Sequence, residues 1–455
     1  MRLRILFILG IIFGLCINLF AQSGQDNERF FYGSDLDKDF EVVQPDNSFF
    51  NNGIQYGAIL SPIFLYDDNN GGKLTSYILN AKVWAKAYLW NNSFLYISAR
   101  DYYLGVITND GVYAATESDN LLDLDQAYLA MSFLSNRLNI SFGRKYYTMG
   151  TGLVLNGRGD GAEAAWNSAF FSIKALGLYT GLLLKDNNPY HLNDKDITDG
   201  AERMFVGGIF TTYFYNQKLY LLGLVQRDLA DQTEYSESRY DSEYYGIGMD
   251  GIYFGNMAYY AEFIHERGAS YINNADAASK ISLEKSNISA YAINSGIYYY
   301  VPVALHPMLI LQYSFGSGDK YRRRYTGSNR PNAATGEDDN GFIAFGTFTG
   351  GYALRPNLGN MHILRAGFSF APLTKVSLGA KYLYYLKDKK EAPINSDEGR
   401  LPEAFIGQGV DVSFRWQIFP DLSMYVNYGL FIPGDAYDSA NENCNFIMAG
   451  INLSI

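Results

Sequence analysis

Apolar and polar residues alternate strictly along several segments of this chain. In residues 81–90, Ala, Val and Leu alternate with Lys, Trp and Tyr, and residues 126–133 and 410–418 repeat the pattern. Successive side chains of a β-strand point to opposite faces of the sheet. Each segment is therefore predicted to be a strand with one apolar face and one wet face.

This alternation, together with the absence of long apolar runs, points to a membrane-spanning barrel. No stretch after residue 21 approaches the ~20 apolar residues of a membrane helix. Only helices and closed barrels cross lipid, because every backbone polar group must be paired there. Tyrosines cluster at expected strand ends, as at 298–300 and 382–385, like the aromatic girdles of membrane barrels. The strands of a β-sandwich also alternate between apolar and polar residues, although they are shorter. The lengths of the connections must therefore distinguish a sandwich from a barrel.

The expected connections alternate between short and long. Eight short turns and nine longer polar loops predict eighteen antiparallel strands, with residues 341–352 taken as loop. This is the bacterial rule of short periplasmic turns and long external loops. The short turns are placed at 91–92, 135–136, 176–177, 216–217, 255–256, 301–302, 372–373 and 420–421, and the long loops at 67–75, 108–121, 148–167, 186–202, 229–241, 267–286, 317–359, 388–404 and 434–443.

The N-terminus predicts export. Arg2 and Arg4 precede an apolar run over 5–17, and Ala21 offers a small residue for cleavage, so residues 1–21 are interpreted as a signal peptide. Residues 22–50 are a polar periplasmic lead-in, and residues 51–455 form the barrel. We therefore expect a bacterial outer-membrane protein. A lipoprotein reading through Cys16 ranks lower, because the preceding residues fit a lipidation box poorly.

The net charge of the chain limits its possible binding partners, and its cysteine content limits its possible disulfides. The chain carries a formal net charge of −11 and a cleaved product would be more acidic still, which argues against nucleic acid as a partner. Cleavage at Ala21 would leave Cys444 alone, so no internal disulfide is expected. The expected partners are outer-membrane lipid and the barrel-assembly machinery. That machinery often recognises a terminal aromatic residue, whereas this chain ends in Ile455.

The face opposite the apolar one carries an excess of cations. Acidic residues predicted on that face are Glu262, Asp250 and Asp411, and most negative charge is assigned to loops around 119–125, 231–243 and 337–339. Inward Arg and Lys side chains favour anions in a pore. Equally, they could pair with carboxylates and brace the wall. The predicted basic residues are Lys82, Lys86, Arg100, Lys174, Arg365, Lys381 and Arg415.

Residues 142–147, continuing to a glycine-rich segment over 157–161 that contains Arg158, hold the densest basic cluster near a loop. By default, these glycines are interpreted as turn residues. Strict alternation turns Lys145 inward and leaves Arg144 on the apolar face, and a bulge at Gly143 would exchange them. One of the two is predicted to face the channel. A further basic cluster, 322–324 with Arg330, lies in the longest loop and is either solvated or folded inward as a constriction.

Enzyme and metal signatures are weak. The four histidines, His191, His265, His306 and His362, have no metal-ligand spacing, and no G-x-S-x-G elbow occurs. The acidic stretches 67–71 and 194–196 lack the spacing of a calcium loop and fit turns better. Neither catalysis, nor a cofactor, nor a metal is therefore expected.

Three stretches of the chain resemble the alginate-export porin family. These are Phe142–Leu153 followed by Ala169–Phe171, then Pro356–Gly367 with Pro372–Leu373, and finally Asp411–Ser423 with Tyr428–Asp435. The resemblance covers the middle and last third of the chain. It implies an eighteen-stranded barrel with a basic conduit for an anionic polyuronate. Arg144 stands at the family's basic position, Lys145 replaces its usual Gln, and Arg365 falls in the matching late strand.

These observations predict a passive channel for anionic or polar solutes, with an anionic polysaccharide or oligosaccharide among them. The alternative is a surface adhesin or receptor that binds through loops such as 317–359 and uses the barrel as an anchor. A barrel hydrolase is the weakest reading, because no nucleophile and base pair is recognisable.

Overall fold

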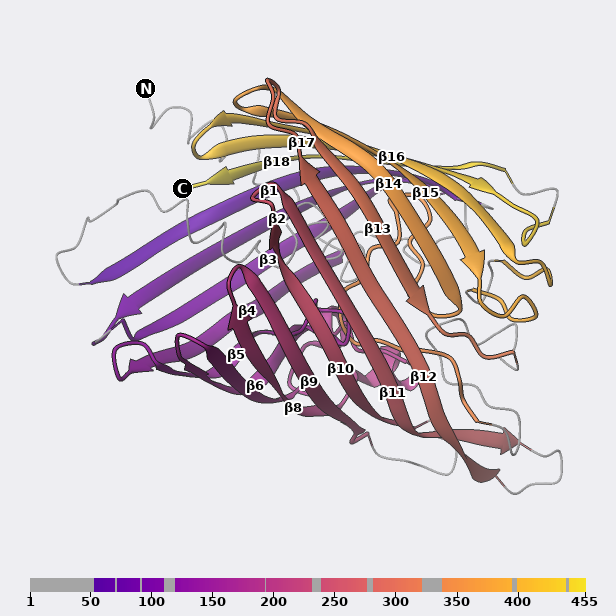
Figure 1. Ribbon diagram of the computed structural model, residues 1–455, viewed down its shortest axis with the longest axis horizontal. Helices are drawn as coiled ribbons and strands as arrows, with labels where there is room; N and C mark the ends of the chain where they lie inside the picture. The colour runs from indigo at the N-terminus through magenta and orange to yellow at the C-terminus, as the bar shows by residue number, and fades with distance from the viewer. Residues whose placement is uncertain are drawn as a thin grey trace.

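Eighteen antiparallel strands close into a barrel in the computed structural model of the chain (Figure 1). It describes residues 53–69, 72–90, 92–109, 119–192, 194–230, 239–275, 281–320, 338–394, 399–438 and 442–455. The predicted signal peptide, the lead-in and the 322–330 basic cluster lie outside these residues. Among the described residues, no helix is both long and apolar enough to cross a membrane.

The strands follow chain order around the barrel, each paired with the next. The first nine are β1 (Ile54–Asn69), β2 (Gly72–Tyr88), β3 (Phe94–Asn109), β4 (Asp119–Phe133), β5 (Leu138–Met149), β6 (Leu155–Asn167), β7 (Phe171–Tyr179), β8 (Arg203–Phe214) and β9 (Gln217–Asp228). The others are β10 (Tyr240–Tyr253), β11 (Met257–Ala275), β12 (Ile281–Tyr300), β13 (Met308–Gly316), β14 (Met361–Leu373), β15 (Val376–Lys387), β16 (Phe405–Phe419), β17 (Leu422–Pro433) and β18 (Cys444–Ser454). Two short helices, η3 (Lys185–Asn187) and α4 (Asp194–Asp199), interrupt the β7–β8 connection.

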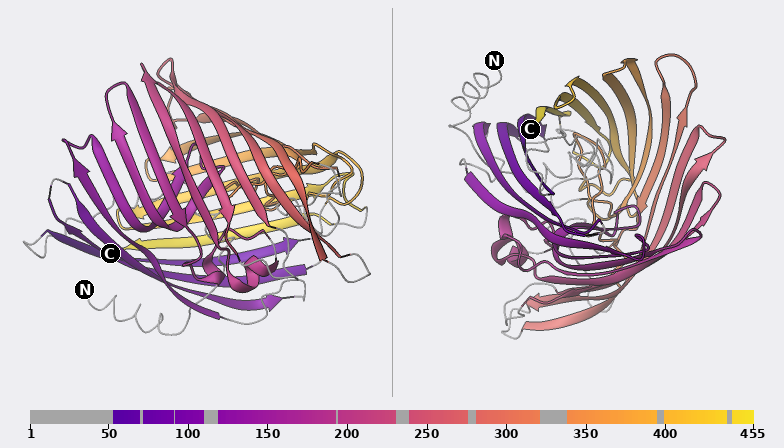
Figure 2. Two further views of the ribbon diagram at one scale, coloured as in Figure 1. Left: turned by 90° about the horizontal axis from the view of Figure 1, so that it is seen from below. Right: turned by 90° about the vertical axis from the view of Figure 1, so that its left-hand side faces the viewer.

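The first and last strands close the sheet. β1 pairs with β18 in antiparallel register from Ile59↔Ser454 to Asp68↔Asn445. Beyond this ladder, Ala58 and Ile455 exchange backbone hydrogen bonds of 2.9 and 2.8 Å. The right-hand view of Figure 2 shows the resulting ring of strands. The barrel and the count of eighteen are therefore confirmed.

The alternation sorts side chains to two faces as predicted. Along β2, Val83 is 58% exposed on the outer face, whereas Ile78, five residues away and on the other face, is 2% exposed. On the outer faces of β9 and β16, Leu221 and Val412 are likewise exposed. In a membrane protein, such an apolar outer band contacts lipid acyl chains.

Several predicted boundaries are wrong. The turn expected at 176–177 lies inside β7, and residues 168–170 make that turn. The loop expected over 148–167 is instead most of a hairpin, β5 and β6, joined by residues 150–154. Its repeated glycines suggested a loop, but they lie in paired strands. Similarly, the connections at 67–75 and 267–286 shorten to 70–71 and 276–280, because both hairpins stay in register to their tips.

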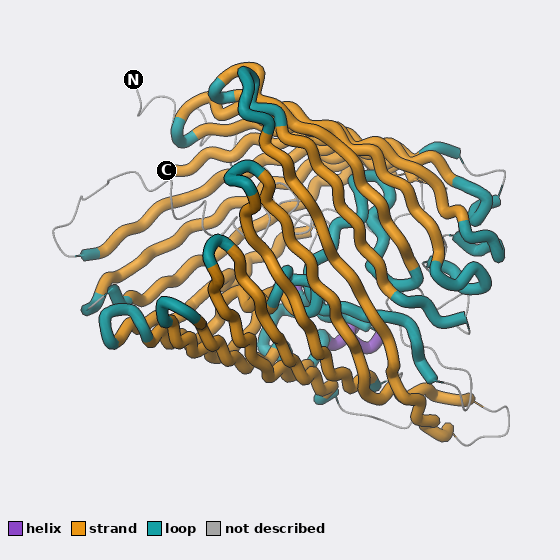
Figure 3. Tube along the Cα trace, in the orientation of Figure 1, coloured by secondary structure: helices purple, strands orange, loops and turns teal. Residues whose placement is uncertain are grey.

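Connections on the long-loop side fold into the barrel. Figure 3 shows loop segments inside the ring of strands. The described part of the β13–β14 connection includes Phe342, Ile343, Tyr352 and Leu354, all at most 4% exposed, and these join one apolar cluster with inward residues of the wall such as Phe205. The interior is thus partly filled by chain rather than lined by strands alone.

The two-faced wall predicts a strong effect of charge at Val83. This residue lies five positions from the short-turn end of β2, near the middle of the ~10 residues that cross the hydrocarbon core. Val83→Arg is expected to lower the free energy of unfolding by about 2–4 kcal/mol, measured by urea titration in liposomes. Val83→Leu should leave it nearly unchanged. Equal stability of the two variants would contradict a lipid-facing position.

Candidate transport site inside the barrel

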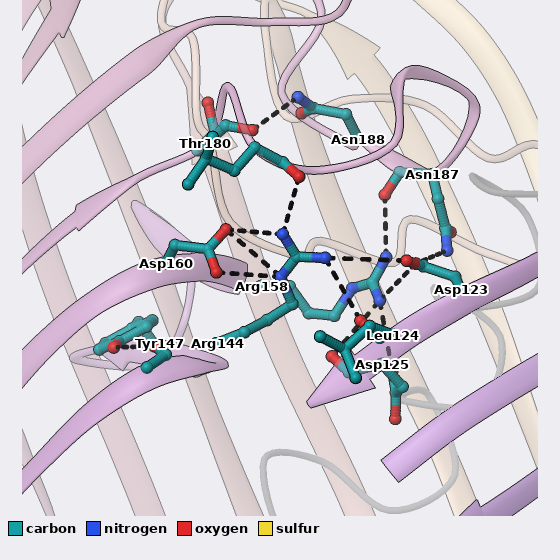
Figure 4. A network of polar contacts seen from close by, with 12 residues as sticks. Asp123, Leu124, Asp125, Arg144, Tyr147, Arg158, Asp160, Thr180, Asn187 and Asn188 are labelled. Atoms are coloured by element: carbon teal, nitrogen blue, oxygen red, sulfur yellow. Dashed lines mark hydrogen bonds and ion pairs between the residues drawn. The ribbon is translucent and has the colours of Figure 1, made fainter. Parts of the chain in front are cut away.

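A network of ion pairs joins the inward faces of β2, β3 and β4 to the β5–β6 hairpin. The Asp125 carboxylate lies 2.8 Å from Nζ of Lys82 and 3.8 Å from Nη2 of Arg100. Nη1 of Arg158 lies 2.7 Å from Asp123 and 3.5 Å from Asp125 (Figure 4). The Arg158, Asp123 and Asp125 side chains are almost fully buried. These charges are therefore compensated by one another rather than by water.

A bulge in β4 places Asp125 in this network. The β3–β4 ladder runs Ser98↔Gln126 and then Ala99↔Leu124, so Asp125 is the extra residue. Its carboxylate accepts a hydrogen bond of 3.3 Å from the Ser98 hydroxyl, on the inward face of β3. A bulge changes which side chains share a face. The sequence prediction that placed residues 119–125 in a loop is wrong, because β4 begins at Asp119.

The β5–β6 hairpin leaves the wall at Arg144. Pairing between β4 and β5 ends at Ala127↔Arg144, and pairing between β6 and β7 ends at Asp160↔Tyr179. Beyond these points, the two strands pair only with each other. Gly143 has a φ of +124° at this departure, and a Cβ there would collide with the carbonyl oxygen of Ala127. Only glycine fits such a position without strain.

This departure explains the positions of both Arg144 and Lys145. Lys145 keeps the predicted inward direction, with Nζ 3.1 Å from Glu163 and 2.9 Å from the Ser141 hydroxyl. Arg144 lies on the opposite face, with Nη2 2.9 Å from Asp160. It is nevertheless shielded, because the carbonyl of Leu182, in the β7–β8 connection, accepts a 2.7 Å hydrogen bond from it. The bulge considered at Gly143 does not form, since the register is unbroken there.

At least five of the nine predicted basic residues therefore lie within 4 Å of a carboxylate. Lys174 is the fifth, with Nζ 3.7 Å from Glu163 and donating a 2.7 Å hydrogen bond to the carbonyl of Thr148. Asp123, Asp125, Asp160 and Glu163 were not recognised as interior residues from the sequence. Along β2–β6 the wall-bracing interpretation thus describes the cations better than the anion-path interpretation.

The other four predicted residues lie elsewhere on the inner wall. Lys86 on β2 has its Nζ 4.2 Å from the centroid of the Phe94 ring. Arg365 donates hydrogen bonds to the Thr349 carbonyl (2.9 Å) and to the Ser314 hydroxyl (2.5 Å). Lys381 and Arg415 lie on β15 and β16, where Lys381 is directly opposite Asp411 in the ladder.

Carboxylates on β11 hold the connections that enter the barrel. At the tip of the β5–β6 hairpin, Thr151 donates to Glu262 from its backbone nitrogen (2.9 Å) and its hydroxyl (2.6 Å). Four residues further along β11, Glu266 accepts a 3.0 Å hydrogen bond from the backbone nitrogen of Ile343. The Tyr244 hydroxyl contacts Glu266 at 3.1 Å and donates a 2.8 Å bond to the Ile343 carbonyl. Since β5 and β11 are six strands apart in the ring of eighteen, these contacts cross part of the interior.

The two entering segments also bind each other and the far wall. The backbone nitrogens of Gly346 and Thr347 donate to Leu153 and Gly152 of the hairpin, at 3.0 and 3.1 Å. Further along, the Tyr352 nitrogen donates to both oxygens of Asp411 on β16, at 3.1 and 3.2 Å. Together, residues 150–154 and 342–354 form an internal bridge between β11 and β16.

The β7–β8 connection adds a third inward segment. Arg203 is fully buried and binds Asp196 (2.5 Å), Asp228 (3.3 Å) and the Tyr190 carbonyl (2.9 Å). The Tyr190 and Phe205 ring centroids lie 5.4 Å apart. Burial lowers the pKa of His191 in this connection, so it adds no positive charge at neutral pH.

The acidic stretches considered as turns have structural partners. Asp67 pairs with Arg355 of the β13–β14 connection, and Asp196 pairs with Arg203. Among the described residues, no group of three His, Cys, Asp or Glu side chains is placed to hold a metal ion.

Sequence reasoning missed Arg158, Arg203 and Glu266. Each is buried and charged, which only a partner makes tolerable. The partners of Arg158 and Glu266 lie in elements far apart in the chain. Arg158 was noted within a glycine-rich segment, and the alternation of that segment would have identified it as a strand.

Comparison with known proteins agrees with this geometry. The sequence profile of the family described as "Alginate export" matches residues 180–446. Among solved structures, the barrel is similar to OccK2 (OpdF) of Pseudomonas aeruginosa, with a TM-score of 0.54 and 11% identity over 88% of this chain and 98% of that one. OccK7 (OpdD) of the same organism has a TM-score of 0.54 and 9% identity, over 89% of this chain and 99% of that one. A BenF-like porin from Pseudomonas fluorescens Pf-5 has a TM-score of 0.53 and 7% identity, over 88% of this chain and 98% of that one. No curated protein matches the sequence.

The buried network predicts that removal of Arg158 is costly. Arg158→Met removes the nearest cation of the buried Asp123, which among the described residues keeps only Arg144, at 3.8 Å, as an ion-pair partner. It should lower the free energy of unfolding by about 3–5 kcal/mol, measured by urea titration in liposomes. The control is Lys218→Met, which removes the 3.0 Å pair with Asp250 where both side chains are well exposed. There the loss should stay below about 1 kcal/mol. Similar losses in both variants would contradict the network's structural role.

The hydrogen bond from the Ile343 nitrogen to Glu266 predicts that loss of this carboxylate changes the channel current. Glu266→Ala removes the acceptor of the Ile343 nitrogen, so residues 342–354 should leave their position more often and the single-channel current should fluctuate between more levels. Glu266→Gln keeps an acceptor oxygen and should resemble the parent protein. Indistinguishable current records for Glu266→Ala and the parent would show that Glu266 does not hold this segment.

Proposed function

Because the chain belongs to the alginate-export family of β-barrel channels in the bacterial outer membrane, we propose that it is a passive channel for anionic and polar solutes, uronate oligosaccharides included. No chemical step is required of it. The protein supplies a water-accessible route and an electric field along that route.

The charge of the β14–β18 wall carries this proposal. These five strands contain the cations Arg365, Lys381, Lys387 and Arg415, but a single carboxylate, Asp411. By contrast, the cations Lys82, Arg144, Lys145 and Arg158 of β2–β6 each lie within 4 Å of a carboxylate. The late wall therefore has an excess of positive charge, which attracts anions within the low-dielectric surroundings of the barrel.

Arg365 is the best-positioned member of this wall. Its hydrogen bonds go to the neutral Thr349 carbonyl and Ser314 hydroxyl, and its guanidinium carbon lies 5.4 Å from the Phe348 ring centroid. Among the described residues, no carboxylate oxygen lies within 4 Å of its nitrogens. Neutral partners fix the direction of the guanidinium without cancelling its charge, so its field acts on the solute.

The proposed class of solute, uronates, is inferred from the chemistry of the wall and from the alginate-export family. The alginate-export description concerns a polyuronate, and a structure of OccK2 is described as a complex with glucuronate. Both are sugars that carry carboxylates. A wall with an excess of cations offers such a solute an electrostatic gain that a neutral sugar does not receive. Contacts with outer-membrane lipid and with the barrel-assembly machinery belong to the same proposal.

The adhesin alternative has less support. Its main candidate was the connection 317–359, yet residues 342–354 of that connection pack inside the barrel against β11 and β16. Buried residues of this kind are placed to shape a route through the barrel rather than to bind a partner outside it.

Arg365 should control ion preference. Arg365→Ala, alone and with Arg415→Ala, is expected to reduce the anion-to-cation permeability ratio severalfold, measured from the reversal potential of planar bilayers in a salt gradient. The control is Arg267→Ala, whose side chain is 58% exposed near Glu243. An unchanged ratio in the double variant would refute the role of the late wall.

A further inference from the structure

The inner wall of β2–β4 carries an aromatic surface next to a lysine. We propose that Trp84, Tyr96 and Tyr128 form a sugar-binding platform, on which one pyranose ring of a uronate oligosaccharide stacks while Lys86 binds its carboxylate. This inference rests on the proposed function and adds a specific binding site to it. The platform lies on the other side of the ion-pair network from the internal bridge.

The three rings belong to neighbouring strands and share the inward face. Trp84 is opposite Ser98, two residues from Tyr96, and Tyr96 is directly opposite Tyr128. Ring centroids lie 6.3 Å apart for Trp84 and Tyr96, with planes only 17° apart, and 5.4 Å apart for Tyr96 and Tyr128. The rings therefore cover a continuous part of the wall, and none of them is fully buried.

Gly57, which has no side chain, leaves room for the Trp84 ring on the wall. Gly57 of β1 is directly opposite Trp84 in the ladder. A Cβ on Gly57 would lie 2.9 Å from Cε2 and Cζ2 of the indole, closer than real contacts allow. The indole thus lies over β1, in the space that a side chain at position 57 would take. A flat, rigid aromatic face suits the C–H-rich face of a pyranose, because its π cloud is negative.

Cations lie at both ends of this surface. The Lys86 ammonium is 4.2 Å from the Phe94 ring centroid and 5.1 Å from that of Tyr88, so it lies beside the aromatic surface. At the other end, Lys82 belongs to the ion pair with Asp125. An aromatic face with an adjacent ammonium matches a sugar ring that bears a carboxylate. A neutral sugar would use only the face, and a simple anion only the charge.

The position of the platform fits a route through the barrel. Tyr88 and Phe94 flank the short turn 89–93, so the platform lies between that rim and the Asp125 network. A solute that passes along this wall therefore meets the aromatic surface near the short-turn end of the barrel.

The test is calorimetric titration of the purified barrel in detergent. The probes are trigalacturonate and citrate, a trivalent anion without a sugar ring. Trp84→Ala is expected to weaken trigalacturonate binding about three- to tenfold, the usual range for an aromatic contact, and to leave citrate binding unchanged. Trp84→Tyr should restore most of the loss. Trigalacturonate binding by Trp84→Ala within twofold of the parent, or an equal loss for both probes, would overturn the platform.

The matched control is Trp416→Ala, a tryptophan on the outer face of β16 that is 40% exposed. It should not change binding of either probe. Because titration does not depend on current, this result is separate from that for the proposed function. A parent protein that binds trigalacturonate through Trp84 but shows no anion preference would refute the channel proposal alone. Anion-selective currents without an effect of Trp84 would refute the platform alone.

Discussion

Backbone hydrogen bonding in lipid is the constraint on which the whole structure depends. A strand in the hydrocarbon core finds no water, so each of its backbone groups must pair with a neighbouring strand. The β1–β18 pairing supplies the last of these partners and leaves no open edge. Closure at eighteen strands makes an interior too wide for side chains alone to fill. The β5–β6 hairpin and the β7–β8 and β13–β14 connections enter this space.

The charges of the inner wall divide into three sectors with different tasks. Along β2–β6, cations and carboxylates neutralise each other and fix the hairpin where it leaves the wall. On β11, Glu262 and Glu266 bind the backbone of the entering segments. On β14–β18, cations exceed carboxylates. This excess of cations is the basis of the proposed anion preference, so anion attraction is expected to be strongest along β14–β18.

The barrel could be predicted from the sequence because period-two alternation and turn composition are local properties. The interior could not, because its contacts depend on register. Asp125 reaches Lys82 only through a bulge that local pattern does not show, and Glu266 binds Ile343, which is 77 residues away. The glycines of 157–161 suggested a loop, whereas they lie in a paired hairpin that bends away from its neighbours. The sequence left braced and conducting cations equally open. Carboxylates lie beside most cations of β2–β6, whereas conduction along β14–β18 is a proposal.

The central claim is that this closed barrel conducts and prefers anions. The most direct test is the reversal potential of the unmodified protein in a planar bilayer with a tenfold potassium chloride gradient. The account predicts discrete single-channel currents and a reversal potential of the sign set by chloride. A reversal potential of the sign set by potassium, or a folded barrel that inserts without any current, would contradict it.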